Sequence, residues 1–164
     1  MDLNLEIEVG KLLRECGLRL AIAESCTGGL IGHRLTNIPG SSTYYMGSIT
    51  AYAYEAKVRL LGVTWETLEK YGAVSPETVT EMARGVREEL AADIGISVSG
   101  IAGPGGGTEE KPVGLVYFCL STVEGEWHRK MVFKGERVEV KEKAADYALQ
   151  FLLEHLKAKN EERE

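Results

Sequence analysis

Apolar residues recur along the chain at spacings that switch between those of a helix and those of a strand. Near the N-terminus, one helical face carries Leu5, Val9, Leu12, Leu13 and Cys16. We expect this helix to end at Gly17, before a short buried strand over residues 18–24. A second helix is predicted over 27–37, where Ile38, Pro39 and Gly40 would close it.

The middle of the chain predicts one strand and two helices. Residues 42–52 are β-branched and aromatic, which favours a strand, and 55–62 are typical of a short helix ending in glycine. Ser75, Pro76 and Glu77 combine a capping hydroxyl, a proline in the first turn and an acid, so they mark a helix start. The buried stripe of that helix is Val79, Met82, Val86 and Leu90.

The last third predicts three strands and a long helix. Residues 94–103 form an apolar run into glycine, and 114–122 and 126–133 favour an antiparallel pair joined around Glu124 and Gly125. The helix over 137–158 would bury Val140, Ala144, Tyr147, Phe151 and Leu152. This order of elements predicts an α/β fold, a three-layer α/β/α sandwich with a mixed, roughly five-stranded sheet.

Length and charge narrow the class of protein. The 164 residues suit one domain over 1–164, with a frayed tail from about 160 to 164. The formal net charge of -6 argues against a nucleic-acid-binding protein, which would present a basic surface. A few local cations and backbone amides could still hold one small anion.

Other features exclude a membrane protein and a metalloprotein. No apolar run approaches the roughly 18 residues that span a bilayer, and the acidic N-terminus is unlike a secretory signal. Three cysteines at unrelated spacings and three separated histidines suggest neither a disulfide framework nor a metal site. We therefore expect a cytoplasmic protein that needs no metal and no organic cofactor.

The segment Ala23-Glu24-Ser25-Cys26-Thr27-Gly28-Gly29 lies where a strand is predicted to give way to a helix. A helix N-terminus offers free N–H groups and a partial positive charge, which suit a nucleophile with an oxyanion hole or a phosphate. Two alternatives stay open. Ser25 or Thr27 could simply cap the helix, and Cys26 could be the nucleophile, because a helix N-terminus lowers the pKa of a thiol.

Two further segments could carry chemistry. Lys57 could be a general base if burial lowers its pKa, with Tyr52 relaying a proton, although a lysine on a short helix is usually a solvated surface residue. Residues 99–114 hold six glycines directly after a predicted strand, so successive N–H groups could form an anion nest. A flexible surface loop is the alternative, which two prolines and a hydroxyl in the loop make less favourable.

Three stretches, taken in order, resemble one family. AESCTGG (23–29), GAVS (72–75) and SGIAGPGGGTEEKPVG (99–114) are similar to the C-terminal domain family of the competence/damage-inducible protein CinA. The resemblance covers about residues 5–155. It implies an α/β/α sandwich with a mixed five-stranded sheet. It also implies hydrolysis of nicotinamide mononucleotide to nicotinate mononucleotide and ammonia by a stand-alone amidase domain, since the larger N-terminal domain of full-length members is missing.

The resemblance also implies a catalytic set, with Ser25 as nucleophile and Tyr52 and Lys57 beside it. We then expect Lys57 to be buried, with a lowered pKa and its amine within hydrogen-bond reach, or one water, of the Ser25 hydroxyl. We expect a phosphorylated pyridine nucleotide as the small-molecule partner, and a homo-oligomer. The predicted substrate-binding residues are Thr27, Gly28, Gly29, Gly103, Gly105, Gly106, Thr108, Lys111, Arg137 and Lys141.

The sequence departs from the family pattern at two places. The family commonly has Tyr-Ser-Asn before Glu-Ala-Lys, whereas this chain has Tyr52, Ala53 and Tyr54. An arginine typical of the start of the last helix is Lys141 here, and lysine lacks the bidentate geometry that arginine offers a phosphate. Two other functions therefore remain as alternatives: a non-catalytic nucleotide- or partner-binding module, or an amidase acting on a different amide.

Overall fold

The computed structural model describes residues 3–163. The helices are α1 (Asn4–Cys16), α2 (Leu30–Thr36), α3 (Tyr54–Leu61), α4 (Trp65–Tyr71), α5 (Pro76–Glu89) and α6 (Arg137–Arg163), with one 3-10 turn, η1 (Ser41–Thr43). The strands are β1 (Leu20–Glu24), β2 (Tyr45–Thr50), β3 (Ile94–Gly100), β4 (Leu115–Thr122) and β5 (Gly125–Val132).

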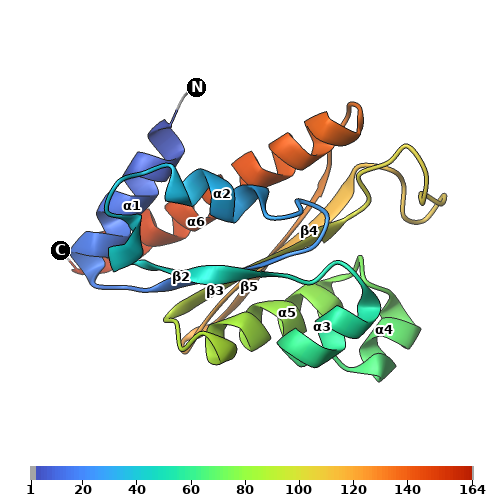
Figure 1. The fold of residues 1–164 in the computed structure, drawn as a ribbon, viewed down its shortest axis with the longest axis horizontal. Coiled ribbons are helices and arrows are strands. Elements are labelled where there is room, and N and C mark those ends of the chain that lie inside the picture. The colour runs from blue at the N-terminus through green and yellow to red at the C-terminus, as the bar shows by residue number, and fades with distance from the viewer. Residues whose placement is uncertain (1–2, 164) are drawn as a thin grey trace.

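The five strands form one mixed sheet in the order β2-β1-β3-β4-β5. β1 runs parallel to both β2 and β3, whereas β4 is antiparallel to β3 and to β5. Helices α1, α2 and α6 cover one face of the sheet and α3, α4 and α5 cover the other (Figure 1). The predicted three-layer α/β/α sandwich with a mixed five-stranded sheet is therefore confirmed.

The interior strand β1 sends alternate side chains into two separate cores. Leu20 and Ile22 pack toward α1 and α6, and Ala21 and Ala23 pack toward α5. All five residues of β1 are buried. A buried interior strand places its carboxyl end, at Glu24, between the two helical layers, where open α/β sheets bind ligands.

Some predicted boundaries were wrong. The strand expected from 42 begins only at Tyr45, because 41–43 form η1, and the strand expected to reach 103 ends at Gly100. The helix expected from 27 begins at Leu30, since Gly28 and Gly29 have positive φ angles that a helix does not accept. Helix α4 was not predicted, because its seven residues bury only Leu68.

The last helix is longer than predicted. It continues to Arg163, through most of the tail that was expected to be frayed, and residue 164 lies outside the described part. Leu156 is fully buried and the Lys159 amine lies 2.7 Å from a Glu124 carboxylate oxygen, so the β4–β5 hairpin holds this end of the helix. Among the helices of residues 3–163, none is long and apolar enough to cross a membrane.

Candidate active site at the carboxyl end of strand β1

Ser25 directly follows β1 and is 7% exposed. The side chains of β1 alternate, so Ser25 continues the face of Ala21 and Ala23, toward the layer of α3 and α5. The carboxyl ends of β2 and β3 lie on either side, because both strands run parallel to β1. Residues from three strand ends and from α3 therefore meet around one hydroxyl.

Glu24 holds the start of α2 in place beside Ser25. Its carboxylate is fully buried and accepts hydrogen bonds from the N–H groups of Ile31 (3.0 Å) and Gly32 (3.0 Å) and from the Thr27 hydroxyl (2.6 Å). An anionic acceptor at a helix N-terminus satisfies donors that otherwise lack partners. Glu24 thus takes the capping role that the sequence left open for Ser25 or Thr27, and neither hydroxyl caps α2.

Lys57 lies on α3 and points into the protein. Its side chain is 1% exposed, and its Nζ lies 2.8 Å from the Ser25 Oγ. Burial lowers the pKa of Lys57 from its usual 10.5 to about 8, because the charged form loses its hydration. The predicted proximity to Ser25, the predicted burial and the predicted direction of the pKa shift are all found.

Two backbone carbonyls fix the direction of the Lys57 amine. Nζ lies 2.7 Å from the Ala51 oxygen and 3.1 Å from the Tyr52 oxygen. A carbonyl can only accept, so each takes one N–H of the amine. In the neutral amine, the remaining position is the lone pair, which then faces the Ser25 hydroxyl. In the ammonium form the same position donates to Ser25, so one geometry suits both protonation states.

The phenol of Tyr52 is directed elsewhere. Tyr52 is 62% exposed, and its hydroxyl accepts a hydrogen bond of 2.9 Å from Arg137, which also donates to the Gly103 carbonyl at 2.6 Å. The contact between Tyr52 and Lys57 is made by the Tyr52 backbone carbonyl. The structure thus gives no support for a proton relay through the phenol and instead places Tyr52 and Arg137 at the rim.

Cys26 is the less suitable nucleophile. Its thiol is 6% exposed, and burial raises its pKa to about 12. Desolvation of the thiolate therefore outweighs the helix N-terminus that the sequence suggested would lower this pKa. A thiol held in its neutral form is a weak nucleophile, which leaves Ser25 with its neighbouring amine as the pair suited to attack.

A small pocket opens over Ser25, and a groove lies along the turn at 27–29 that follows it. The pocket, of about 170 Å³, is lined by Ser25, Cys26, Tyr52, Lys57, Ala73, Val74, Ser99, Gly100, Ala102 and Arg137. The groove, of about 350 Å³, is lined by Thr27, Gly28, Gly29, Leu30, His33, Val138, Lys141 and Glu142. The pocket is smaller than the roughly 300–1,000 Å³ typical of small-molecule sites.

The predicted substrate-binding residues fall into separate places. Arg137 borders the pocket, while Thr27, Gly28, Gly29 and Lys141 border the groove. Gly105, Gly106, Thr108 and Lys111 line neither, and Gly103 reaches the rim only through its carbonyl contact with Arg137.

The glycine-rich loop is closed on itself. Thr108 donates its N–H to the Lys111 carbonyl at 2.7 Å, and its hydroxyl accepts the Lys111 N–H at 3.0 Å. The Lys111 amine lies 2.5 Å from the Tyr71 carbonyl at the end of α4. Figure 1 shows this loop projecting from the end of the sheet. Lys111 therefore ties the loop to α4 rather than facing Ser25.

Backbone N–H groups of 26–29 and 100–103 are candidates for an oxyanion hole near Ser25, and some of them already donate within the protein. Gly28 donates its N–H to the Ser25 carbonyl, and Ile101 donates to Leu115. This narrows the backbone candidates to the rest of the 26–29 turn and to Gly100, Ala102 and Gly103.

The departures from the family pattern lie away from the Ser25–Lys57 contact. Ala53 is exposed and precedes α3 with extended backbone angles. The Tyr54 hydroxyl accepts a hydrogen bond of 3.4 Å from the Ala73 N–H, and its ring lies 6.5 Å from that of Trp65. Tyr54 therefore connects α3 to the segment of Ala73 and Val74 that forms one wall of the pocket.

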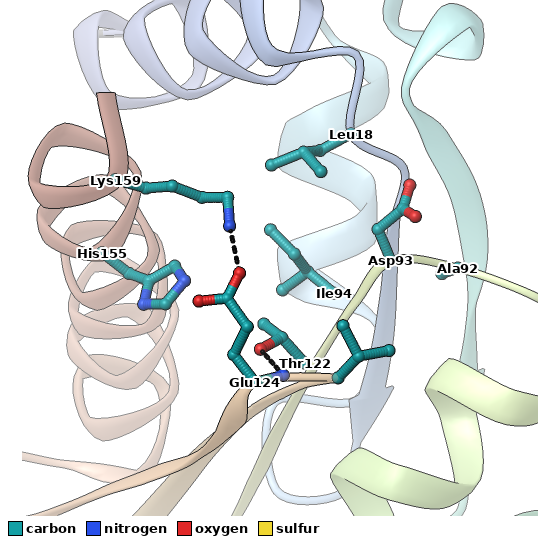
Figure 2. Close-up of a pocket in the computed structure, with 9 residues that line it drawn as sticks. Leu18, Ala92, Asp93, Ile94, Thr122, Glu124, His155 and Lys159 are labelled. Carbon is teal, nitrogen blue, oxygen red and sulfur yellow. Dashed lines mark hydrogen bonds and ion pairs between the residues drawn. The ribbon is translucent and has the colours of Figure 1, made fainter. Parts of the chain in front are cut away.

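A second pocket lies at the opposite end of the sheet and lacks comparable chemistry. Figure 2 shows the Lys159 amine against the Glu124 carboxylate, with His155 beside them and Leu18 and Ile94 facing them. The Thr122 hydroxyl accepts the Glu124 N–H at 3.0 Å, which leaves this pocket without a hydroxyl and amine paired as at Ser25. Within residues 3–163, no three His, Cys, Asp or Glu side chains are grouped to hold a metal ion.

Comparison with known proteins agrees with this architecture. Residues 2–156 match the family model described as the CinA C-terminal domain. A relative from Halothermothrix orenii, provisionally named a competence-damage inducible protein, is 54% identical over 95% of this chain. A CinA-like protein from Desulfotalea psychrophila is 49% identical over 90% of it. These matches span 38% and 36% of the relatives, so the chain covers well under half of their length.

Solved structures match over nearly their whole length. A CinA superfamily protein from Klebsiella pneumoniae has a TM-score of 0.92 and 35% identity, and the match covers 95% of this chain and 98% of that one. A competence/damage-inducible protein from Agrobacterium tumefaciens has a TM-score of 0.91 and 39% identity, with 94% of each chain covered. The match of sequence, family model and fold shows that the chain belongs to the CinA C-terminal domain family.

Proposed function

We propose that this chain is a serine amidohydrolase that converts nicotinamide mononucleotide to nicotinate mononucleotide and ammonia. The observation that supports it best is the buried Lys57 amine, 2.8 Å from the Ser25 hydroxyl and with a pKa lowered to about 8. A lysine of this kind is partly neutral at neutral pH and can act as a general base. The substrate is the one that the resemblance to the family implies.

In the proposed first step, neutral Lys57 takes the Ser25 proton while Oγ bonds to the carboxamide carbon. The carbonyl electron pair moves to oxygen and gives an oxyanion. The C–N bond then breaks, and the leaving nitrogen takes the proton from Lys57 and departs as ammonia. Water attacks the acyl-enzyme, giving its proton to Lys57, and Ser25 leaves with that proton as the acid forms.

A binding module without turnover is the second candidate. It was suggested by the departures from the family pattern at Ala53 and Tyr54. Both residues are exposed, and neither lies between Ser25 and Lys57. Because the hydroxyl–amine pair is intact, turnover is the better-supported proposal. An amidase with another substrate would share the Ser25 chemistry and differ only in what the pocket and groove accept.

One assay separates the three possibilities. Ammonia release would be measured with nicotinamide mononucleotide, nicotinamide riboside, nicotinamide and a panel of unrelated primary amides, and binding of each would be measured in parallel. Fastest release from the mononucleotide supports the proposal. Tight binding of the nucleotide without ammonia release would identify a binding module, and faster release from another amide would reassign the substrate.

Tyr52→Phe should keep most of the catalytic activity. The contact of Tyr52 with Lys57 is through the backbone carbonyl, which phenylalanine retains, and the lost phenol hydroxyl bonds only Arg137 at an exposed position. Loss of one such hydrogen bond is expected to lower kcat by less than about tenfold. Steady-state kinetics of the variant check this. A loss of 10³-fold or more is the size expected when a proton-transfer group is removed, and it would show that the phenol takes part in the reaction.

Lys141→Ala should raise KM for the mononucleotide roughly tenfold, since a hydrogen bond to a charged phosphate is worth about 1.5–3 kcal/mol. The Lys141 side chain borders the groove, and its Nζ lies 3.6 Å from the position that a Cβ on Gly28 would take. Lys143→Ala is the matched control, because Lys143 is exposed two residues along α6 and bonds the Lys134 carbonyl. Equal KM values for all three chains would remove the phosphate from this groove.

Binding of the phosphate in this groove should also raise the rate of deamidation. Remote contacts orient the reacting carboxamide, so kcat/KM for nicotinamide riboside should fall well below that for the mononucleotide. Lys111→Ala should have a smaller effect than Lys141→Ala, because the Lys111 amine already bonds the Tyr71 carbonyl.

A further inference from the structure

Ser99 lies beside Ser25 on the neighbouring strand. In the parallel pairing of β1 with β3, Ala23 is opposite Ser97. Two residues further along each strand, the same register brings Ser25 alongside Ser99, and adjacent strands are about 4.8 Å apart. Both serines border the same pocket. The Ser97 hydroxyl bonds the Val79 carbonyl of α5, so the alternate residue Ser99 also faces the α5 side of the sheet, as Ser25 does.

The Ser99 side chain borders the pocket, and its hydroxyl is not used within the protein. Ser99 is 1% exposed, and among residues 3–163 its hydroxyl has no hydrogen-bond partner. Ser97, two residues earlier on the same face and equally buried, has its hydroxyl satisfied at 2.5 Å. Because Ser99 borders the pocket and its hydroxyl has no partner in the protein, this hydroxyl is available to a bound ligand.

Ser99 and Lys57 lie on opposite sides of Ser25. The Lys57 amine is held by the carbonyls of Ala51 and Tyr52, which follow β2, and β2 pairs with one edge of β1. Ser99 belongs to β3, which pairs with the other edge. A carboxamide attacked by Ser25 must turn its nitrogen toward Lys57, the group that protonates it on leaving. Its oxygen is then turned away from Lys57, toward Ser99.

We propose that the Ser99 hydroxyl donates a hydrogen bond to the oxyanion that forms when Ser25 attacks the carboxamide. This inference rests on the proposed function and adds a side-chain donor to the backbone N–H groups of the oxyanion hole. The hydroxyl keeps its proton throughout, so the electron and proton balance of the reaction is unchanged. A donor aimed at charge that develops in the transition state acts on kcat more than on KM.

The test compares Ser99→Ala with Ser97→Ala in nicotinamide mononucleotide hydrolysis. Ser99→Ala should lower kcat about 10²-fold, the usual effect of removing one oxyanion donor, with little change in KM and an unchanged midpoint of the pH–rate profile. Ser97→Ala removes an equally buried hydroxyl that bonds α5, so it should lower the melting temperature and leave kcat within about twofold of wild type. Melting temperatures of both variants exclude loss of folded protein as the cause.

The inference is overturned if kcat of Ser99→Ala falls less than about tenfold, if Ser97→Ala loses as much, or if the pH–rate midpoint moves, which would point to Lys57. A second substrate, 4-nitrophenyl acetate, separates this result from the proposed function, because acetylation of Ser25 also passes through an oxyanion. The wild type could prove inactive on the mononucleotide while 4-nitrophenyl acetate acetylates Ser99→Ala more slowly than the wild type. That result would support the role of Ser99 and reject the proposed substrate. If the wild type is inactive on the mononucleotide, equal acetylation rates of the two chains, or no acetylation of the wild type, would reject the role of Ser99.

Discussion

Ser25→Ala is expected to lower the rate of amide hydrolysis by about 10⁴-fold or more, because it removes the atom that bonds to the substrate. The fold should persist, since the change deletes one oxygen from a side chain whose neighbours, Lys57 and the turn at 26–29, keep their other contacts. Lys57 would still donate to the Ala51 and Tyr52 carbonyls. Ammonia release and thermal unfolding, measured on the same preparation, check both parts.

Cys26→Ala is the matched control, one residue along the chain. Its thiol is buried and held neutral by a pKa raised to about 12, so removing it should leave most of the activity while costing some packing energy. Mass spectrometry of a trapped acyl-enzyme would place the acyl group on the peptide and residue that carry it. An acyl group on Cys26, or an inactive Cys26→Ala beside an active Ser25→Ala, would transfer the role of nucleophile to the thiol.

The layers of the fold follow from the sequence because its buried stripes are periodic. Val79, Met82 and Val86 recur at helical spacing and are all fully buried in α5. The strands β4 and β5 likewise form the predicted antiparallel pair, and the turn between them lies at the predicted position, because β4 ends at Thr122 and β5 begins at Gly125. Short elements that bury few side chains were harder to predict. Both η1 and α4 are of this kind, so the spacing of apolar residues carries little information about them.

The site was only partly accessible to sequence reasoning. Ser25 and Lys57 could be paired through the family resemblance, but 32 residues separate them and nothing in the spacing alone brings them to 2.8 Å. Glu24 and Ser99 belong to the stretches 23–29 and 99–114 that resemble the family, but the sequence did not predict a function for either side chain. Their roles depend on which N–H groups and which strand lie next to them, and strand order is a property of the folded sheet rather than of either motif.

In the loop predicted to bind phosphate, the structure pairs polar groups within the protein. Glycines and a lysine in 99–114 suggested an anion nest, yet the structure bonds Thr108 to Lys111 and Lys111 to the Tyr71 carbonyl. Composition shows that a loop can bend and donate, but not toward which neighbour it does so. Lys141, 30 residues further along the chain, is the lysine that the fold brings to the 27–29 turn.

Lys57→Met is expected to lower kcat by at least about 10³-fold, since general-base catalysis is worth 10²–10⁴ and the same group also protonates the leaving nitrogen. For the wild-type chain, the base must be neutral, so the rate should rise with pH through about 8 and level off above it. The residual rate of the variant should not show this rise. Lys11→Met, a change at an exposed residue of α1, serves as the control with wild-type kinetics.

The same lysine should also be visible in stability. The unfolded chain keeps the Lys57 proton up to its usual pKa of 10.5, whereas the folded chain loses it near 8. Below pH 8 both states are protonated and burial of the ammonium destabilises the fold. Between these values the unfolded state binds more protons, so the free energy of unfolding should rise with pH by up to roughly 3 kcal/mol.

Denaturant titrations of the wild-type and Lys57→Met chains at pH 7 and pH 10 measure the contribution of Lys57 to this free energy, because all other groups titrate in both chains. The wild-type chain should gain stability relative to the variant at the higher pH. Equal pH dependence in the two chains would mean that Lys57 is not buried as an ammonium, and the proposed base would then lose its physical cause.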